Sequence, residues 1–193
     1  MPTKPHRPMS DKAAARWHAF FCDWRSPHVA GLALEILSNI AGDHILDDHR
    51  LKWAKEAHLA WRYGKELELK AIRVVKADPP DFEALTETGS VQRCEAVEVL
   101  RPGRRRDQEL RQERLKPLTV IHDPEEGWPS VAEALTAVDA QIAKKAGNAY
   151  RERFVLVVYI NLGFIRGDHD AFRQSLAVRQ AKGHPMFAAL HLL

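Results

Sequence analysis

With 193 residues, of which 45% are hydrophobic and 28% charged, the chain is long enough to fold as a domain with a sizeable apolar core. Its formal net charge is only +3, so the overall charge does not by itself imply a nucleic-acid partner. Cys22 and Cys94 have the spacing of neither a metal site nor a disulfide framework, which predicts a protein of the reducing cytoplasm. We expect no secretory signal and no membrane span, because no stretch is apolar over the required length.

The N-terminal part predicts helices that precede the main domain. Residues 1–9 contain three prolines and are expected to be a disordered leader. Residues 10–42 predict an appendage of two helices, since Ser10 and Ser26-Pro27 are typical helix starts and Gly42 a typical end. The first of these helices carries aromatic residues at helical spacing: Trp17, Phe20, Phe21 and Trp24. Such a stripe favours a place in the core, and the alternatives are stacking on bases or a homodimer surface.

A third helix is expected to begin near Asp43 or Asp47 and to close at Gly64. Glu56 lies at the edge of its apolar face, where an exposed ion-paired Glu is the simplest interpretation. Apolar and charged residues alternate from Glu66 to Val75, and this pattern predicts a strand.

Acidic residues follow in two extended segments. Pro79-Pro80 excludes helix and starts the first segment. The period of two in a strand places Phe82 in the core and puts Asp81 and Glu83 together on the opposite face. A second strand is predicted for residues 91–100, which are rich in β-forming side chains.

On this second strand Glu95 and Glu98 are expected to face opposite sides, and we place Glu95 inside. A buried Glu is costly without a partner, so its position favours a functional site. If Asp81 and Glu95 lie a few ångströms apart on neighbouring antiparallel strands, they need a cation or a proton between them. Carboxylates on rigid strands are common ligands of Mg²⁺.

Pro80-Asp81 and Glu95-Ala96-Val97 resemble the motif of the PD-(D/E)XK nuclease superfamily, which has the restriction-endonuclease-like fold. In that motif a Lys stands two residues after the Glu, whereas this chain has Val97. Some branches of the family have an uncharged residue there and a second Glu beside it, as Glu98 is here. The predicted order of elements also matches the αβββαβ core of that superfamily. We therefore expect an α/β fold with a central mixed sheet in residues 43–193.

The resemblance implies one or two Mg²⁺ or Mn²⁺ ions held by Asp81, Glu95 and the backbone carbonyl of Ala96. Glu83 is a plausible third carboxylate, and the resemblance suggests Glu56 as a further acid. In some branches the catalytic Lys or Gln lies on a later helix, which this chain has at about residues 131–147. The candidates on that helix are Gln141, Lys144 and Lys145. The alternative is a basic helix end that interacts favourably with the helix dipole.

Between the acidic strand and this helix, residues 101–114 contain a cluster of arginines. Arginine suits phosphate because of its planar donor fork, so the cluster predicts contacts with a DNA or RNA backbone. The candidates are Arg104, Arg105, Arg106 and Arg111. A solvated charged helix is the alternative, since three acids offset much of the charge: Asp107, Glu109 and Glu113.

Toward the end of the chain, residues 154–160 predict a buried strand, 169–181 a helix and 186–193 a further extended segment. The sequence thus predicts a metal-dependent phosphodiesterase that acts on nucleic acid. Because Val97 replaces the motif Lys, a catalytically inactive nuclease-fold module that binds nucleic acid or protein is the second hypothesis. A protein–protein component that dimerises through its N-terminal helices is the third.

Overall fold

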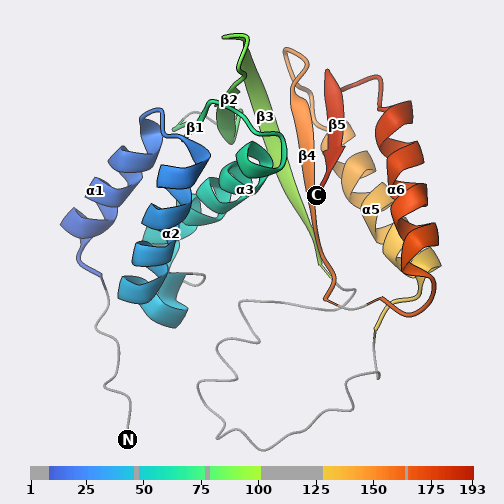
Figure 1. The fold of residues 1–193 in the computed structure, drawn as a ribbon, viewed down its shortest axis with the longest axis horizontal. Helices are drawn as coiled ribbons and strands as arrows, with labels where there is room; N and C mark the ends of the chain where they lie inside the picture. Colours follow the sequence, from blue (N-terminus) through green and yellow to red (C-terminus); the bar gives the residue numbers. More distant parts are fainter. Residues whose placement is uncertain (1–8, 46–47, 77–78, 101–127, 164) are drawn as a thin grey trace, which may run out of the picture. The chain divides into compact units, whose positions relative to one another are not determined.

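A computed structural model describes residues 9–45, 48–76, 79–100, 128–163 and 165–193. Its helices and strands form an α/β fold, which confirms the predicted fold class (Figure 1). The described helices are α1 (Asp11–Cys22), α2 (Pro27–Ala41), α3 (Lys52–Glu66), α5 (Val131–Ala146) and α6 (His169–Lys182), with two short 3-10 helices, η1 (Gly42–Ile45) and η2 (His49–Leu51). The strands are β1 (Ala71–Val74), β2 (Phe82–Leu85), β3 (Val91–Leu100), β4 (Val155–Asn161) and β5 (Ala189–Leu192).

The strands form one five-stranded mixed sheet in the order β1-β2-β3-β4-β5. β1 and β2 are antiparallel, as are β2 and β3, whereas β4 and β5 are parallel. The chain divides into two compact units, Met1–Cys94 and Glu95–Leu193, and the division falls within β3. No helix in the described part of the chain is both long and apolar enough to cross a membrane.

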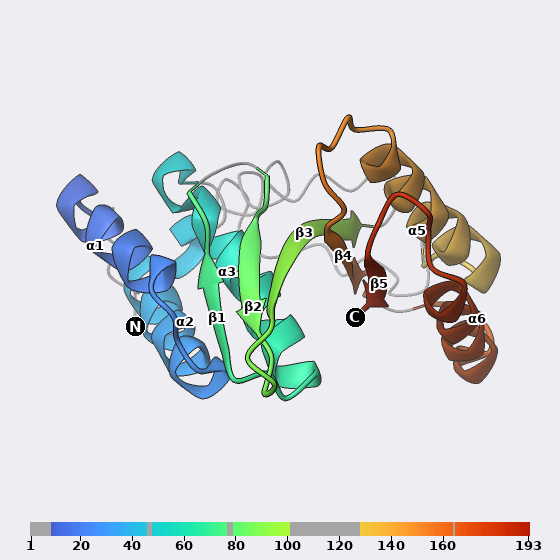
Figure 2. The ribbon, with the colours of Figure 1, turned by 90° about the horizontal axis from the view of Figure 1, so that it is seen from above.

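In the first unit, helices α1, α2 and α3 lie beside β1 and β2 (Figure 2). The two serines predicted as caps accept hydrogen bonds from backbone N–H groups, Ser10 from Ala13 and Ser26 from Val29. Phe21 of the aromatic stripe is buried and packs on Trp53 of α3, with ring centroids 5.6 Å apart. The helices expected to form an appendage therefore share a core with α3, and the predicted boundary at residue 42 lies inside this unit.

The predicted strand 66–75 is shorter than expected, because α3 continues to Glu66 and β1 begins only at Ala71. The carbonyls at the end of α3 hold the intervening turn, and one of them, that of Gly64, accepts a hydrogen bond from the N–H of Leu69. Glu68 has a positive φ of 50° in this turn, which is incompatible with a strand. Residues 67–70 therefore form a turn after α3 and not the first part of a strand, although their apolar and charged side chains alternate.

Gly64 lies inside α3, although it was predicted to end the helix. A Cβ at this position would lie 2.8 Å from Ile72 of β1 and 3.0 Å from Pro27 of α2. The missing side chain therefore allows α2 and β1 to approach α3 closely.

In the second unit, α5 and α6 lie side by side next to β4 and β5 (Figure 1). The start of α5 is fixed by a capping box between Ser130 and Glu133. The predicted buried strand is β4, and its side chains enter a core shared by both helices: Val99, Ala134, Val138, Ile142, Leu156, Val158, Leu162, Phe172, Phe187 and Leu190. The last strand begins at Ala189, three residues later than expected, because Phe187 turns into this core.

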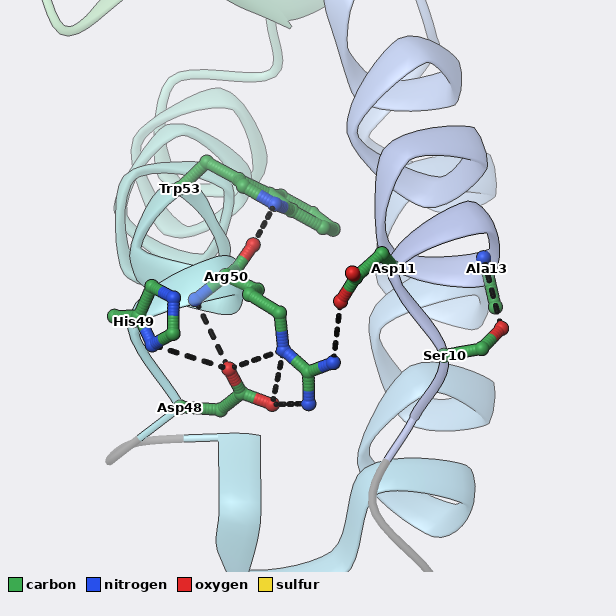
Figure 3. A network of polar contacts seen from close by, with 7 residues as sticks. All are labelled: Ser10, Asp11, Ala13, Asp48, His49, Arg50 and Trp53. Carbon is green, nitrogen blue, oxygen red and sulfur yellow. Dashed lines mark hydrogen bonds and ion pairs between the residues drawn. The ribbon is translucent and has the colours of Figure 1, made fainter.

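A polar network in the first unit joins the start of α1 to η2 (Figure 3). The guanidinium group of Arg50 donates to Asp48 and, over 2.6 Å, to Asp11 of α1. Asp48 also caps η2 by accepting from the N–H of Arg50. The hydrogen bonds from Arg50 lower the pKa of Asp48 from its ordinary value of 3.8 to about 2.

We expect Gly64→Ala to lower the free energy of unfolding by up to about 2 kcal/mol. Overpacking costs roughly 1–3 kcal/mol, whereas Ala gains about 1 kcal/mol over Gly in a helix. Chemical denaturation measures the difference. The control is Gly147→Ala at the end of α5, where the nearest atom to a new Cβ is 3.5 Å away, and it should not destabilise. Equal stability of the two variants would contradict the close packing around Gly64.

The ionised Asp48 carboxylate should stabilise the fold at neutral pH and lose this contribution in acid. Because the folded-state pKa of Asp48 lies below its unfolded value, its contribution is complete above about pH 5 and is lost as the pH falls toward 2. At pH 6 we expect the free energy of unfolding of wild type to exceed that of Asp48→Asn by roughly 1 kcal/mol, because solvent screens part of the interaction. Asn retains the cap, so the variant isolates the charge. Urea denaturation at both pH values should show this difference vanishing near pH 2, and a constant difference would contradict the assignment.

Candidate functional site

Among the described residues of the second unit, Glu95 is the charged residue that is buried most completely. Its exposed fraction is 2%, and it is the one buried polar or charged residue among those that the structure describes. It lies on β3 with Val97 and Val99 on the same face, by the period of two. Val99 belongs to the apolar core beneath α5 and α6, and Val97 packs against that core. The prediction that Glu95 points inward is therefore confirmed.

One oxygen of the Glu95 carboxylate accepts two hydrogen bonds. The ammonium group of Lys145 donates to Oε2 over 2.6 Å, and the hydroxyl group of Tyr150 donates to the same atom over 3.0 Å. Asn148 donates in turn to the Tyr150 oxygen over 3.0 Å. Burial raises the pKa of Tyr150, so its hydroxyl keeps its proton at neutral pH and remains a donor.

The other oxygen, Glu95 Oε1, is buried and has no hydrogen-bond partner among the described residues. A buried carboxylate oxygen without a donor is unfavourable in a folded protein. The site therefore consists of a half-satisfied carboxylate and an adjacent ammonium group.

The amphipathic pattern of α5 selects which lysine reaches the site. Val138 and Ile142 are buried against the core, and Lys145 follows Ile142 by three residues on the same side of the helix. The side chain of Lys145 is only 22% exposed, whereas Lys144 is exposed. Gln141, one turn before Lys145, is half-buried. Of the three residues on this helix that could replace the motif Lys, Lys145 is the one that contacts Glu95.

Glu83, which was expected to be a third metal-binding carboxylate, instead forms ion pairs with two arginines. Its carboxylate accepts from Arg73 over 2.6 Å and lies 3.7 Å from Arg93. The three residues are aligned across β1, β2 and β3 by the strand register. Two cations thus hold Glu83, which makes it a poor third ligand for a metal ion.

The remaining predicted ligands are placed as follows. Asp81 is half-buried directly before β2 in the first unit, and its backbone N–H donates to the carbonyl of Cys94 over 3.0 Å. Glu56 is half-buried on α3, and Ala96 is buried on β3. Glu98 accepts from Asn161 of β4 over 2.8 Å. Within the ranges that the structure describes, no three acids, histidines or cysteines are grouped to hold a metal ion.

The arginines proposed to bind phosphate lie outside the described residues: Arg104, Arg105, Arg106 and Arg111. Sequence reasoning missed Tyr150, the second donor to Glu95. It is separated from Glu95 by 55 positions, and no spacing rule connects them. Only its place just after a helix that ends in lysines could have drawn attention to it.

We expect Lys145→Met to destabilise the protein by about 3 kcal/mol, because it leaves the buried Glu95 without its cation. Lys144→Met, an adjacent change on an exposed position, should have an effect below about 0.5 kcal/mol. The double variant Glu95→Gln with Lys145→Met should recover part of the loss, since no unpaired charge remains. Chemical denaturation of wild type, Glu95→Gln, Lys145→Met and the double variant measures the coupling, and additive effects would show that the pair is not coupled.

We compared the chain with models of known protein families, with curated proteins and with solved structures, and none of them matches. These comparisons therefore assign neither a family nor an activity.

Proposed function

We propose that the chain is a metal-dependent phosphodiesterase of the cytoplasm that hydrolyses the backbone of DNA or RNA. The supporting observation is the buried Glu95 carboxylate, which has Lys145 on one oxygen and no partner among the described residues on the other. This arrangement fits the hypothesis that an amine from a later helix replaces the motif Lys, whose position is filled by Val97.

The unsatisfied oxygen fits a Mg²⁺ or Mn²⁺ ion, since both ions prefer carboxylate ligands. Glu95 Oε1 would hold the ion, and the resemblance adds Asp81 and the carbonyl of Ala96. Glu83 does not fit, because Arg73 and Arg93 hold its carboxylate. Glu56 stays a proposed further acid. Asp81 belongs to the first unit and Glu95 to the second.

A bound ion would lower the pKa of its water ligand and stabilise negative charge on the phosphate. The residues of the chain would prepare this chemistry. Lys145 and Tyr150 hold Oε2, whereas the buried Oε1 has no donor among the described residues. The ammonium group of Lys145 would also orient the attacking water and offset charge on the phosphate. Arg104, Arg105, Arg106 and Arg111 would bind phosphates along the backbone, with an affinity that falls with salt.

A second candidate function is a catalytically inactive nuclease-fold module that binds nucleic acid or protein. The observation that favours it is that cations already pair with two of the proposed ligands, Glu83 and Glu95. A site whose acids are neutralised by the chain itself has less need of a metal ion.

The two candidates make different predictions for Mn²⁺ titration and for cleavage of plasmid DNA and single strands. If the chain is an enzyme, isothermal titration detects Mn²⁺ binding that is lost in Asp81→Ala and in Glu95→Gln. Cleavage should fall at least about 100-fold in both variants and in Lys145→Met, as expected when a proton-transfer or charge-stabilising group is removed. Lys144→Met is the matched control and should retain activity.

Absence of both Mn²⁺ binding and cleavage in the wild-type protein would refute the enzyme and favour the binding module. Retained cleavage in Lys145→Met, with loss in Lys144→Met, would refute the assignment of the amine. Circular dichroism should accompany each variant, so that loss of fold is separated from loss of activity.

A further inference from the structure

An apolar groove lies on the first unit between α1 and α2. Its volume is about 530 Å³. From α1 it is lined by Trp17 and Phe20, and from α2 by Val29, Leu32 and Ile36. Large apolar side chains that line a surface hollow mark a binding site more often than a chance exposure.

The α2 side of this groove belongs to a continuous exposed stripe. Val29, Leu32, Ile36 and Ile40 are 41%, 50%, 51% and 49% exposed, respectively. Their spacing of three or four residues places them on one side of the helix over about three turns. The neighbouring side of α2 is buried within the first unit through Ala30, Leu34 and Leu37. Helix α2 is thus apolar on two adjacent sides, and only one of them is covered by described residues.

Charges of opposite sign flank this surface. Arg16 lines the groove from α1, and Glu35 is exposed on α2 beside the stripe. Within the described part of the chain neither residue forms an ion pair with another side chain. A surface that carries an apolar floor, one cation and one anion pairs with a copy of itself when a two-fold axis passes between the two charges, because each cation then faces the anion of the other copy.

Other occupants match the surface less well. Helix α2 contains no Lys or Arg, which a helix that binds anionic membranes needs on its polar face. Nucleic acid requires excess positive charge, which is absent here. The arginine-rich residues 101–114 are too highly charged for an apolar groove.

We propose that this surface, formed by α1 and α2, binds the same surface of a second copy of the chain in a two-fold symmetric dimer. The stripe of one copy packs into the groove of the other, and Arg16 of each copy pairs with Glu35 of its partner. This inference is independent of the proposed phosphodiesterase activity.

Sedimentation equilibrium of the full chain tests the dimer. We expect wild type to be dimeric at micromolar concentration and Ile36→Glu to raise the dimer dissociation constant at least tenfold. Ile36 is exposed, so the variant should keep its fold, and circular dichroism checks this. The control is Val178→Glu on α6, where the wild-type residue is also apolar and 67% exposed, and this variant should remain dimeric.

A charge exchange tests the orientation. Arg16→Glu and Glu35→Arg should each weaken the dimer about tenfold, and the double variant should restore it. A monomeric wild-type protein at 100 µM would overturn the proposal, whether the groove is then covered by the chain itself or by a different protein. A dimer that is disrupted by Val178→Glu and not by Ile36→Glu would likewise overturn it.

Discussion

The burial of the Glu95 carboxylate on β3 depends on Lys145, which reaches it from the last turn of α5. A buried carboxylate that lost this cation would destabilise the fold by several kcal/mol, so the pair fixes the position of α5 against β3. Tyr150 adds a second donor to the same oxygen and ties the segment after α5 to the strand. The pair thus links the packing of the second unit to the chemistry of its candidate site.

The same pair bears on both interpretations of function. Additional donors normally complete a buried carboxylate. Here one oxygen lacks a partner among the described residues, and this is the feature that a metal ion would explain. Glu83 shows the contrasting case, since Arg73 and Arg93 approach both of its oxygens. Position in an extended segment is therefore insufficient to identify a ligand, and the partners of each acid have to be considered.

In the first unit, close packing brings the helices and strands together. Small residues let its elements approach, as Gly64 does for α3, β1 and α2. Phe21 and Trp53 then complete the contact between α1 and α3. This packing uses only one side of α2, although the helix is apolar on two. A sequence selected only for a monomeric fold would be expected to place polar residues on the side left exposed.

Local patterns in the sequence determined the α/β class, the order of the elements, the capped starts of α1 and α2, and the inward position of Glu95. These features follow from helical and strand periodicity and from caps, which act over a few residues. The tertiary structure decided that Lys145 and not Lys144 meets Glu95, that Tyr150 joins them, and that Arg73 holds Glu83. It also decided that residues 67–70 form a turn, because Gly64 continues α3 where it packs against Ile72. Such contacts join residues as many as 55 positions apart, and only the packing of whole elements brings them together.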